Sequence, residues 1–250
     1  MNRVRVSAPQ CRLFFFPPAG RGASIYAKWV KAFPPGLDIC PIQLPGRENR
    51  LRETPFTSMP DLLNGMIPAI ERLLDVPFAF FGHSMGAIIG FELARELLKR
   101  GLDGPVHLFA SARRAPHLKE PHPPIAHLPD EPFLKEVQRR YGGIPEGVIQ
   151  DSEMKGIILP TLRADFSLLE SYEYSGNSPL SCHITVLGGL QDLDIEEEEL
   201  EAWKEHTTYP TRVQLLPGDH FFLLSAADKV IRTVIQDMEE FHSLRAVRCQ

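Results

Sequence analysis

Residues 76–89 read VPFAFFGHSMGAII, which joins a short apolar run, a G-x-S-x-G pentapeptide and the start of a second apolar pattern. An apolar run that ends at Gly82 is typical of a strand buried on both faces of a parallel sheet. The apolar positions from 87 to 99 repeat with the 3.6-residue spacing of a helix. The sequence therefore predicts that Ser84 occupies the turn between a strand and a helix.

The turn at Ser84 accounts for the two glycines that flank it. A sharp strand-to-helix turn strains its central residue and leaves no room for side chains two positions on either side. Gly82 and Gly86 occupy those two positions. Such a turn, called a nucleophile elbow, holds a serine hydroxyl above the sheet at a helix N-terminus. The alternative is a chance G-x-S-x-G pattern in a helix-capping turn.

Length and composition limit the classes of protein that this chain can belong to. It has 250 residues, 43% hydrophobic and 24% charged side chains, and a formal net charge of −5. The length fits one large α/β domain, and the composition is that of an ordinary globular protein. A nucleic-acid partner is not predicted, because there is no basic excess. No membrane segment is predicted either, because the longest apolar runs are too short to span a bilayer.

The N-terminus and the cysteines bear on the cellular compartment. Residues 1–10 contain no apolar segment of the kind found in secretory signals, so a cytoplasmic location is predicted. The four cysteines, at positions 11, 40, 182 and 249, are far apart and form no C-x-x-C pair. This spacing suggests neither a disulfide framework nor a structural zinc site.

Strand and helix patterns alternate along most of the chain. We expect strands at 13–16, 37–44, 78–81, 106–110, 183–187 and 212–216, and helices at 25–33, 58–74, 87–99, 196–206 and 230–238. Ser225 and Asp228 resemble a capping box before the last helix. With the elbow, this alternation predicts an α/β-hydrolase fold, in which helices cover both faces of a mostly parallel central sheet.

Residues 113–179 interrupt the alternation. The segment begins with several prolines and continues with helical patterns near 133–141 and 152–172, and no strong strand pattern occurs in it. We interpret it as a helical lid inserted into the single domain of residues 1–250. Open α/β sheets bind ligands at the carboxyl ends of their strands, which favours a lid there. The alternative is a helical subdomain that only packs against the sheet.

A serine nucleophile requires a base and an acid that orients the base. In the α/β-hydrolase fold the acid and then the histidine follow the serine, each on a loop after a strand. Of the nine histidines, only His220 has this order and position. Asp192 follows the strand at 183–187, and Asp194 remains an alternative acid. Asp219 is the weakest candidate, because it directly precedes His220 and the side chains of consecutive residues diverge.

Acyl transfer also requires two backbone N–H groups that stabilise an oxyanion. One comes from the residue after the nucleophile, which is Met85. The other comes from the loop after an early strand, where Pro18 has no N–H and Ala19 can donate. His83, beside the nucleophile, is expected to pack against the turn or to orient it.

The chain resembles the stand-alone type II thioesterases that accompany nonribosomal peptide and polyketide synthases. The segments that carry the resemblance are FPPAG at 16–20, QLPGRE at 43–48, GHSMGA at 82–87, LRADF at 162–166, GGLQD at 188–192 and PGDHFF at 217–222. The resemblance implies a triad of Ser84, Asp192 and His220, and oxyanion donors at Ala19 and Met85. It also implies that residues 113–179 form a mobile lid.

The chain departs from the family in its first loop. Many members have His or Tyr where this chain has Pro18, and Gly where it has Arg21. The oxyanion contact uses backbone atoms, so the departure affects the shape of the entrance more than the chemistry.

The resemblance implies hydrolysis of acyl or aminoacyl thioesters on the phosphopantetheine arm of carrier domains, which frees stalled synthases. Phosphopantetheine belongs to the carrier, so no cofactor and no metal is expected in this chain. The alternatives are a medium-chain fatty acyl-carrier thioesterase, a carboxylesterase or acyltransferase of the same fold, and a non-catalytic binding protein.

Carrier domains are usually acidic, which directs attention to basic residues near the lid. Charge steering by lid arginines could dock a carrier, and an ordinary solvated surface is the alternative. The candidates are Arg113, Arg114, Arg139, Arg140 and Arg163.

Overall fold

The computed structural model describes residues 9–144, 146–176 and 178–248. Most of the N-terminal segment for which no secretory signal is predicted lies outside these residues, as does Cys249. The cysteines within them, Cys11, Cys40 and Cys182, are buried. Among the described residues, no helix combines the length and the apolar character needed to cross a bilayer.

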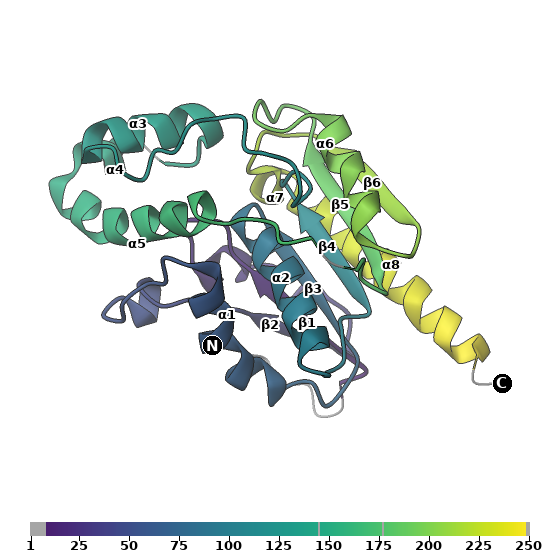
Figure 1. Cartoon of the computed structure of the whole chain (residues 1–250). Helices are drawn as coiled ribbons and strands as arrows, with labels where there is room; N and C mark the ends of the chain where they lie inside the picture. Colours follow the sequence, from purple (N-terminus) through teal and green to yellow (C-terminus); the bar gives the residue numbers. More distant parts are fainter. Residues whose placement is uncertain (1–8, 145, 177, 249–250) are drawn as a thin grey trace.

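A six-stranded sheet forms the centre of the described residues, in the order β2-β1-β3-β4-β5-β6 (Figure 1). Every neighbouring pair of these strands is parallel, which confirms the predicted fold class. The strands are β1 (Cys11–Phe16), β2 (Leu37–Pro41), β3 (Phe78–His83), β4 (His107–Ser111), β5 (His183–Gly189) and β6 (Thr211–Leu216).

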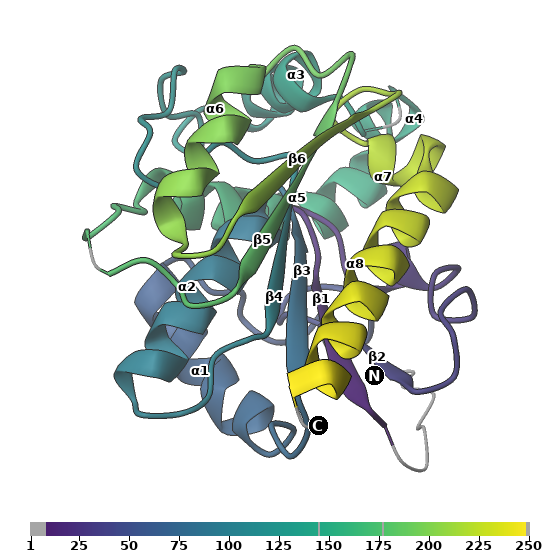
Figure 2. The ribbon, with the colours of Figure 1, turned by 90° about the vertical axis from the view of Figure 1, so that its right-hand side faces the viewer.

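Helices cover both faces of this sheet (Figure 2). On one face lie α1 (Met59–Glu71), α2 (Met85–Lys99) and α6 (Glu197–Glu201), and on the other lies α8 (Ala227–Arg248). Successive residues of a strand point to opposite faces, so Phe80 packs with α1 and α2 while Phe81 packs with α8. Both phenylalanines are fully buried, and each such side chain contributes about 2–3 kcal/mol of burial free energy.

The predicted helix at 25–33 is wrong. Only a short 3-10 helix, η1 (Ala23–Tyr26), forms there, and turns follow it. Tyr26, Trp29 and Phe33 all reach Phe15 of β1, with ring centroids 5.1, 5.9 and 5.7 Å away. Tyr26 also donates its hydroxyl proton to the carbonyl oxygen of Phe16, at 2.8 Å. This aromatic packing outweighs the helical periodicity of the segment.

Three smaller predictions also need correction. The acidic helix at 196–206 divides into α6 and a 3-10 helix, η3 (Ala202–His206). Strand β2 ends at Pro41 rather than at residue 44. Ser225 does not cap the last helix, because it is the final residue of a separate short helix, α7 (Phe222–Ser225). The N–H of Ala226 closes α7 by donating to the Phe222 carbonyl, and α8 begins at Ala227.

Three helices of the 113–179 segment lie beyond the carboxyl ends of the strands (Figure 1). They are α3 (Asp130–Tyr141), α4 (Glu146–Gln150) and α5 (Ser152–Glu170). The described residues of the segment contain no strand. Helices α3 and α5 share a small apolar core that includes Phe133, Val137 and Phe166. Their role as a lid remains a prediction.

The strand, turn and helix predicted around Ser84 are confirmed. Ser84 lies between β3 and α2 with φ of 53° and ψ of −114°. A Cβ atom on Gly82 would lie 2.0 Å from the carbonyl oxygen of Gly86. A Cβ atom on Gly86 would lie 2.1 Å from the carbonyl oxygen of Phe16. Both glycines are therefore required by close contacts between backbone segments.

We expect Gly86→Ala to lower the free energy of unfolding by about 2–3 kcal/mol or more, because a backbone oxygen cannot move aside as a side chain can. Gly90→Ala is the matched control on the same helix, since its Cβ would find its nearest neighbours at 3.4 Å. The control should gain about 0.5–1 kcal/mol from helix propensity. Urea denaturation followed by circular dichroism measures both. Equal stability of the two variants would contradict this account of the elbow.

Acid should destabilise the protein partly through His107 of β4. Burial lowers the pKa of His107 to about 3, with smaller effects from His183 and Arg212. Between that value and the ordinary pKa of about 6.5, the unfolded chain binds a proton that the folded chain does not. Stability should therefore fall as the pH decreases from 6.5 towards 3. His107→Gln, which can still donate to Thr185, should make that decrease shallower in urea titrations at several pH values. An unchanged slope would exclude His107 as a source of the acid lability.

Candidate active site

Ser84 lies at the N-terminus of α2 and lines a cavity. Its amide donates to the Ser111 carbonyl at the end of β4, at 2.7 Å. The turn is thereby tied to the neighbouring strand. The helix N-terminus carries a partial positive charge, which favours negative charge that develops near Ser84.

The structure brings His220 and Asp192 to Ser84. His220 Nε2 is 3.1 Å from Ser84 Oγ, and His220 Nδ1 is 2.8 Å from Asp192 Oδ2. A carboxylate only accepts hydrogen bonds, so Nδ1 carries the proton and Nε2 presents its lone pair to the hydroxyl. The side chains of His220 and Asp192 are 5% and 2% exposed, which excludes most water from this chain of hydrogen bonds. The arrangement is able to remove the proton of Ser84.

The loops that carry the acid and the base are bonded directly to each other. The Gln191 amide donates to the Gly218 carbonyl at 2.9 Å, and the Gly218 amide donates to Gln191 Oε1 at 2.6 Å. A Cβ atom on Gly189 would lie 2.6 Å from the Asp219 carbonyl oxygen, so the loops also pack tightly. These contacts fix the distance between Asp192 and the histidine.

The other two aspartates have different partners. Asp194 Oδ2 accepts from Arg114 at 3.2 Å, and Asp194 Oδ1 is 3.1 Å from His122 Nε2. Asp219 Oδ1 accepts from the Phe221 amide at 2.9 Å and so closes a turn. Of the three aspartates weighed from the sequence, Asp192 is the one that contacts the histidine.

His83 connects the end of β4 to the backbone of His220. It is fully buried, and its Nε2 lies 2.9 Å from the carbonyl oxygen of His220. Its Nδ1 lies 2.8 Å from Ser111 Oγ. Burial lowers the pKa of His83 well below its ordinary value, and the nearby His220 adds to this effect. His83 is therefore neutral, with a proton on Nε2 for the carbonyl, and it orients the backbone of His220.

Ala19 and Met85 are the residues whose backbone N–H groups are expected to stabilise an oxyanion. Ala19 lines the same cavity as Ser84, and Met85 is the first residue of α2. Neither backbone N–H donates to another of the described residues. Two such amides next to a serine hydroxyl can receive the negative oxygen of a tetrahedral intermediate.

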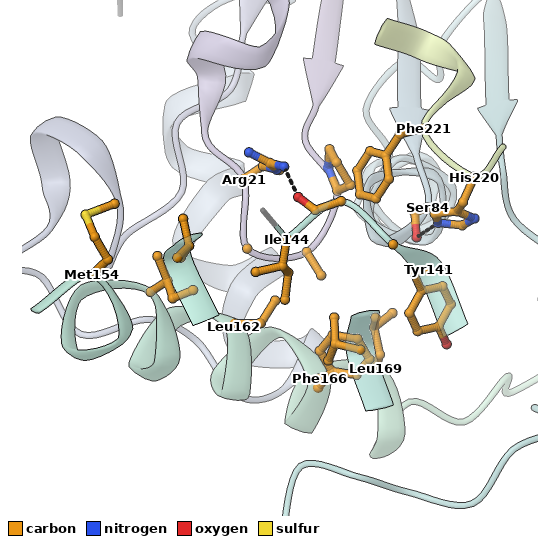
Figure 3. Close-up of a pocket in the computed structure, with 18 residues that line it drawn as sticks. Arg21, Ser84, Tyr141, Ile144, Met154, Leu162, Phe166, Leu169, His220 and Phe221 are labelled. Carbon is orange, nitrogen blue, oxygen red and sulfur yellow. Dashed lines mark hydrogen bonds between the residues drawn. The ribbon is translucent and has the colours of Figure 1, made fainter. Parts of the chain in front are cut away.

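A cavity of about 220 Å³ extends from Ser84 and His220 along α5 towards Met154 (Figure 3). Its walls are mostly apolar and come from residues 18–21, from α3, α4 and residues 142–144 between them, from α5, and from the loop after β6. They include Ile144, Ile158, Leu162, Phe166, Leu169 and Phe221. The spacing of residues 158, 162, 166 and 169 places one face of α5 along the cavity. This helical spacing is a sequence signal from which the apolar wall could have been predicted.

Sequence reasoning missed Tyr141 at this cavity and assigned Arg21 no contact. The Tyr141 ring lies 5.2 Å from the His220 ring, and burial raises the pKa of Tyr141 to about 12. Arg21 donates to the Gly143 carbonyl and lies over the Phe221 ring, 5.8 Å from its centroid. Arg21 thus bridges the first loop and the 113–179 segment, and no sequence pattern indicated this contact.

The suggested docking role is wrong for Arg113 and Arg114, and it stays a prediction for Arg139, Arg140 and Arg163. Arg113 and Arg114 are only 8% and 2% exposed. Arg113 pairs with Glu120, and Arg114 pairs with Asp194 and Glu199. These two arginines anchor the start of the segment, so they do not present charge to a partner. The other three pair with lid carboxylates: Arg139 and Arg140 with Glu136, and Arg163 with Asp130.

Within the described residues, no group of three or more His, Cys, Asp or Glu side chains is arranged to hold a metal ion. The observed chemistry of the site is that of serine, histidine and carboxylate. This arrangement suits nucleophilic attack on an acyl group.

Comparison with known proteins gives consistent results. The sequence model of the thioesterase domain matches residues 11–238. The gramicidin S biosynthesis protein GrsT of Aneurinibacillus migulanus is 44% identical to this chain, over 93% of this chain and 90% of its own length.

Solved structures agree with the sequence matches. ClbQ from the colibactin NRPS/PKS pathway has a TM-score of 0.89 and 30% identity, over 94% of this chain and 99% of its own. The type II thioesterase BorB from the borrelidin biosynthetic cluster has a TM-score of 0.82 and 31% identity, over 93% of each chain. The chain therefore belongs to the thioesterase family, whose members are hydrolases of thioesters with the α/β-hydrolase fold.

Proposed function

We propose that this chain hydrolyses acyl or aminoacyl thioesters from the phosphopantetheine arm of carrier domains and so edits stalled nonribosomal peptide or polyketide synthases. The observation that carries the proposal is the chain of hydrogen bonds from Asp192 through His220 to Ser84, at one end of an apolar cavity. Its relatives from peptide and polyketide pathways support the choice of substrate class.

In the proposed first step, Ser84 Oγ attacks the thioester carbonyl carbon while His220 Nε2 takes the hydroxyl proton. Asp192 stabilises the resulting imidazolium through Nδ1–H. The backbone N–H groups of Ala19 and Met85 stabilise the negative carbonyl oxygen. The C–S bond then breaks, and His220 gives its proton to the departing pantetheine sulfur.

In the second step, water attacks the acyl ester on Ser84 and His220 takes a proton from the water. The C–O bond to Ser84 breaks, the proton returns to Ser84 Oγ, and the free acid leaves. One water is consumed, and one acid and one thiol are produced. This sequence needs no metal or cofactor bound to the chain, because phosphopantetheine arrives on the carrier.

In this proposal the cavity holds the acyl or aminoacyl group of the thioester. At about 220 Å³ it is smaller than the roughly 300–1,000 Å³ common for ligand-binding pockets. The main alternative substrate is a medium-chain fatty acyl group. In this proposal, residues 113–179 act as a lid. Carrier domains are the partners, and the enzyme acts in the cytoplasm.

Asp192→Asn should lower kcat by about 10³- to 10⁴-fold, because an amide favours the wrong tautomer of the catalytic histidine. Asp194→Asn is the matched control, and its kcat per folded molecule should stay within about tenfold, or 1.4 kcal/mol, of the wild type. Steady-state hydrolysis of a short acyl-pantetheine thioester measures both. Equal losses would mean that the assignment of the acid is wrong.

The wild-type enzyme should hydrolyse a carrier-bound short acyl thioester with higher kcat/KM than the free acyl-pantetheine, and the matching oxoester least well. Ser84→Ala should abolish all three activities, because no other group on the proposed pathway forms the acyl ester. A preference for the oxoester, or activity that survives Ser84→Ala, would overturn the proposed function. Release of free thiol and of free acid provides the assay.

A further inference from the structure

A buried ion pair joins two sequence segments that the proposed triad leaves unexplained. Arg47 belongs to the QLPGRE segment and Asp165 to the LRADF segment of α5. Arg47 Nη1 and Nη2 each lie 2.8 Å from one oxygen of Asp165, which is a bidentate arrangement. The two side chains are only 6% and 3% exposed.

The same carboxylate holds the loop that carries Ala19. Asp165 Oδ2 accepts from the Gly20 amide at 2.7 Å. Arg47 Nη1 also donates to the Arg21 carbonyl, at 3.1 Å. The ion pair is therefore hydrogen-bonded to the two residues that directly follow Ala19, to the N–H group of Gly20 and to the carbonyl of Arg21.

Ala19 and Gly20 are the central residues of a tight turn. The Arg21 amide closes this turn by donating to the Pro18 carbonyl, at 3.2 Å. Gly20 has φ of 69°, the conformation that favours glycine at the second central position of such a turn. A Cβ atom on Gly20 would lie 2.6 Å from Leu162 of α5, so the helix packs directly against the turn.

The side chains of Gln43 and Thr161 make further hydrogen bonds between the 43–47 loop and its neighbours. Gln43 Oε1 accepts from the Ala23 amide at 2.8 Å, and Gln43 Nε2 donates to the Arg47 carbonyl at 3.0 Å. Thr161 of α5 donates to the Gly46 carbonyl. The 43–47 loop, α5 and the turn at Ala19 thus form one hydrogen-bonded unit.

Stability alone is a weak reason for a buried ion pair. The cost of removing two charges from water commonly equals or exceeds their attraction, and apolar replacements are often as stable. Burial raises the pKa of Asp165, while Arg47 and the Gly20 amide partly offset that effect. The pair carries this desolvation cost, and Asp165 Oδ2 also accepts from the Gly20 amide. Both features suit a role in positioning the loop.

We propose that Arg47 and Asp165 are positioning residues, which hold the turn at Ala19 so that its N–H meets the oxyanion in the transition state. The inference rests on the proposed function, in which Ala19 is an oxyanion donor. Neither residue lines the cavity at Ser84. Their contribution should therefore appear in kcat, while substrate affinity changes little.

The test replaces the pair by apolar residues of similar size, as Arg47→Met with Asp165→Leu. Removing a single partner would leave a buried charge, whereas the double replacement should keep most of the stability. We expect kcat to fall by about 10²- to 10³-fold, as for loss of one oxyanion donor, with KM within about threefold of the wild type. The affinity of an acyl trifluoromethyl ketone, which forms a tetrahedral adduct with the serine, should fall by the same factor as kcat/KM.

The matched control is Arg12→Met with Asp38→Leu. This pair is also buried, with Arg12 Nε 2.8 Å from Asp38 Oδ2 and side chains 3% and 0% exposed, but it joins β1 and β2 away from the cavity. Its kcat should equal that of the wild type. A control that loses as much kcat as the Arg47–Asp165 variant would mean a general structural effect and would overturn the proposal.

Asp165→Asn provides a second measurement should the double variant not fold. It keeps the shape and one acceptor oxygen but loses the charge, so we expect a fall in kcat of about tenfold, or 1.4 kcal/mol, at unchanged KM. Wild-type kcat, or a rise in KM alone, would overturn the positioning role. Failure of the proposed function would instead appear in the wild-type enzyme, as absence of thioester hydrolysis, so the two failures are distinguishable.

Discussion

Contact between backbone segments at the elbow is the constraint on which the rest of the structure depends. Gly86 meets the end of β1, and Gly82 meets the first turn of α2, with no space for even a methyl group. Since β1 leads within three residues to Ala19, this contact also brings the loop after β1 beside Ser84 and Met85. One packing requirement therefore assembles the serine and both candidate oxyanion amides.

Uncharged hydrogen bonds also contribute to the geometry of the site. His83 is kept neutral by burial and links the end of β4 to the backbone of His220. Gln191 links the loop after β5 to the loop after β6. These ties order the site before any substrate arrives, which is the condition under which fixed dipoles stabilise a developing charge most effectively.

Structure could be predicted from the sequence where a local pattern corresponds to one backbone geometry. It could not be predicted where a residue distant in the sequence determines the contacts. The elbow could be predicted because only glycines fit around such a turn. Asp192 and Asp194 could not be separated, since both follow β5 closely and the difference depends on Arg114, which lies about eighty positions earlier. The helix predicted at 25–33 failed because packing on Phe15 outweighed local preference.

Helix α5 contacts both the cavity and the turn at Ala19. One face, with Leu162 and Phe166, forms the wall of the acyl cavity, and the neighbouring Asp165 holds the turn that carries Ala19. Under the proposed mechanism, an acyl group too large for the cavity would press on the helix that also positions the Ala19 amide. Under that mechanism, the fit of the acyl group in the cavity would affect the rate of the chemical step as well as the affinity for the substrate.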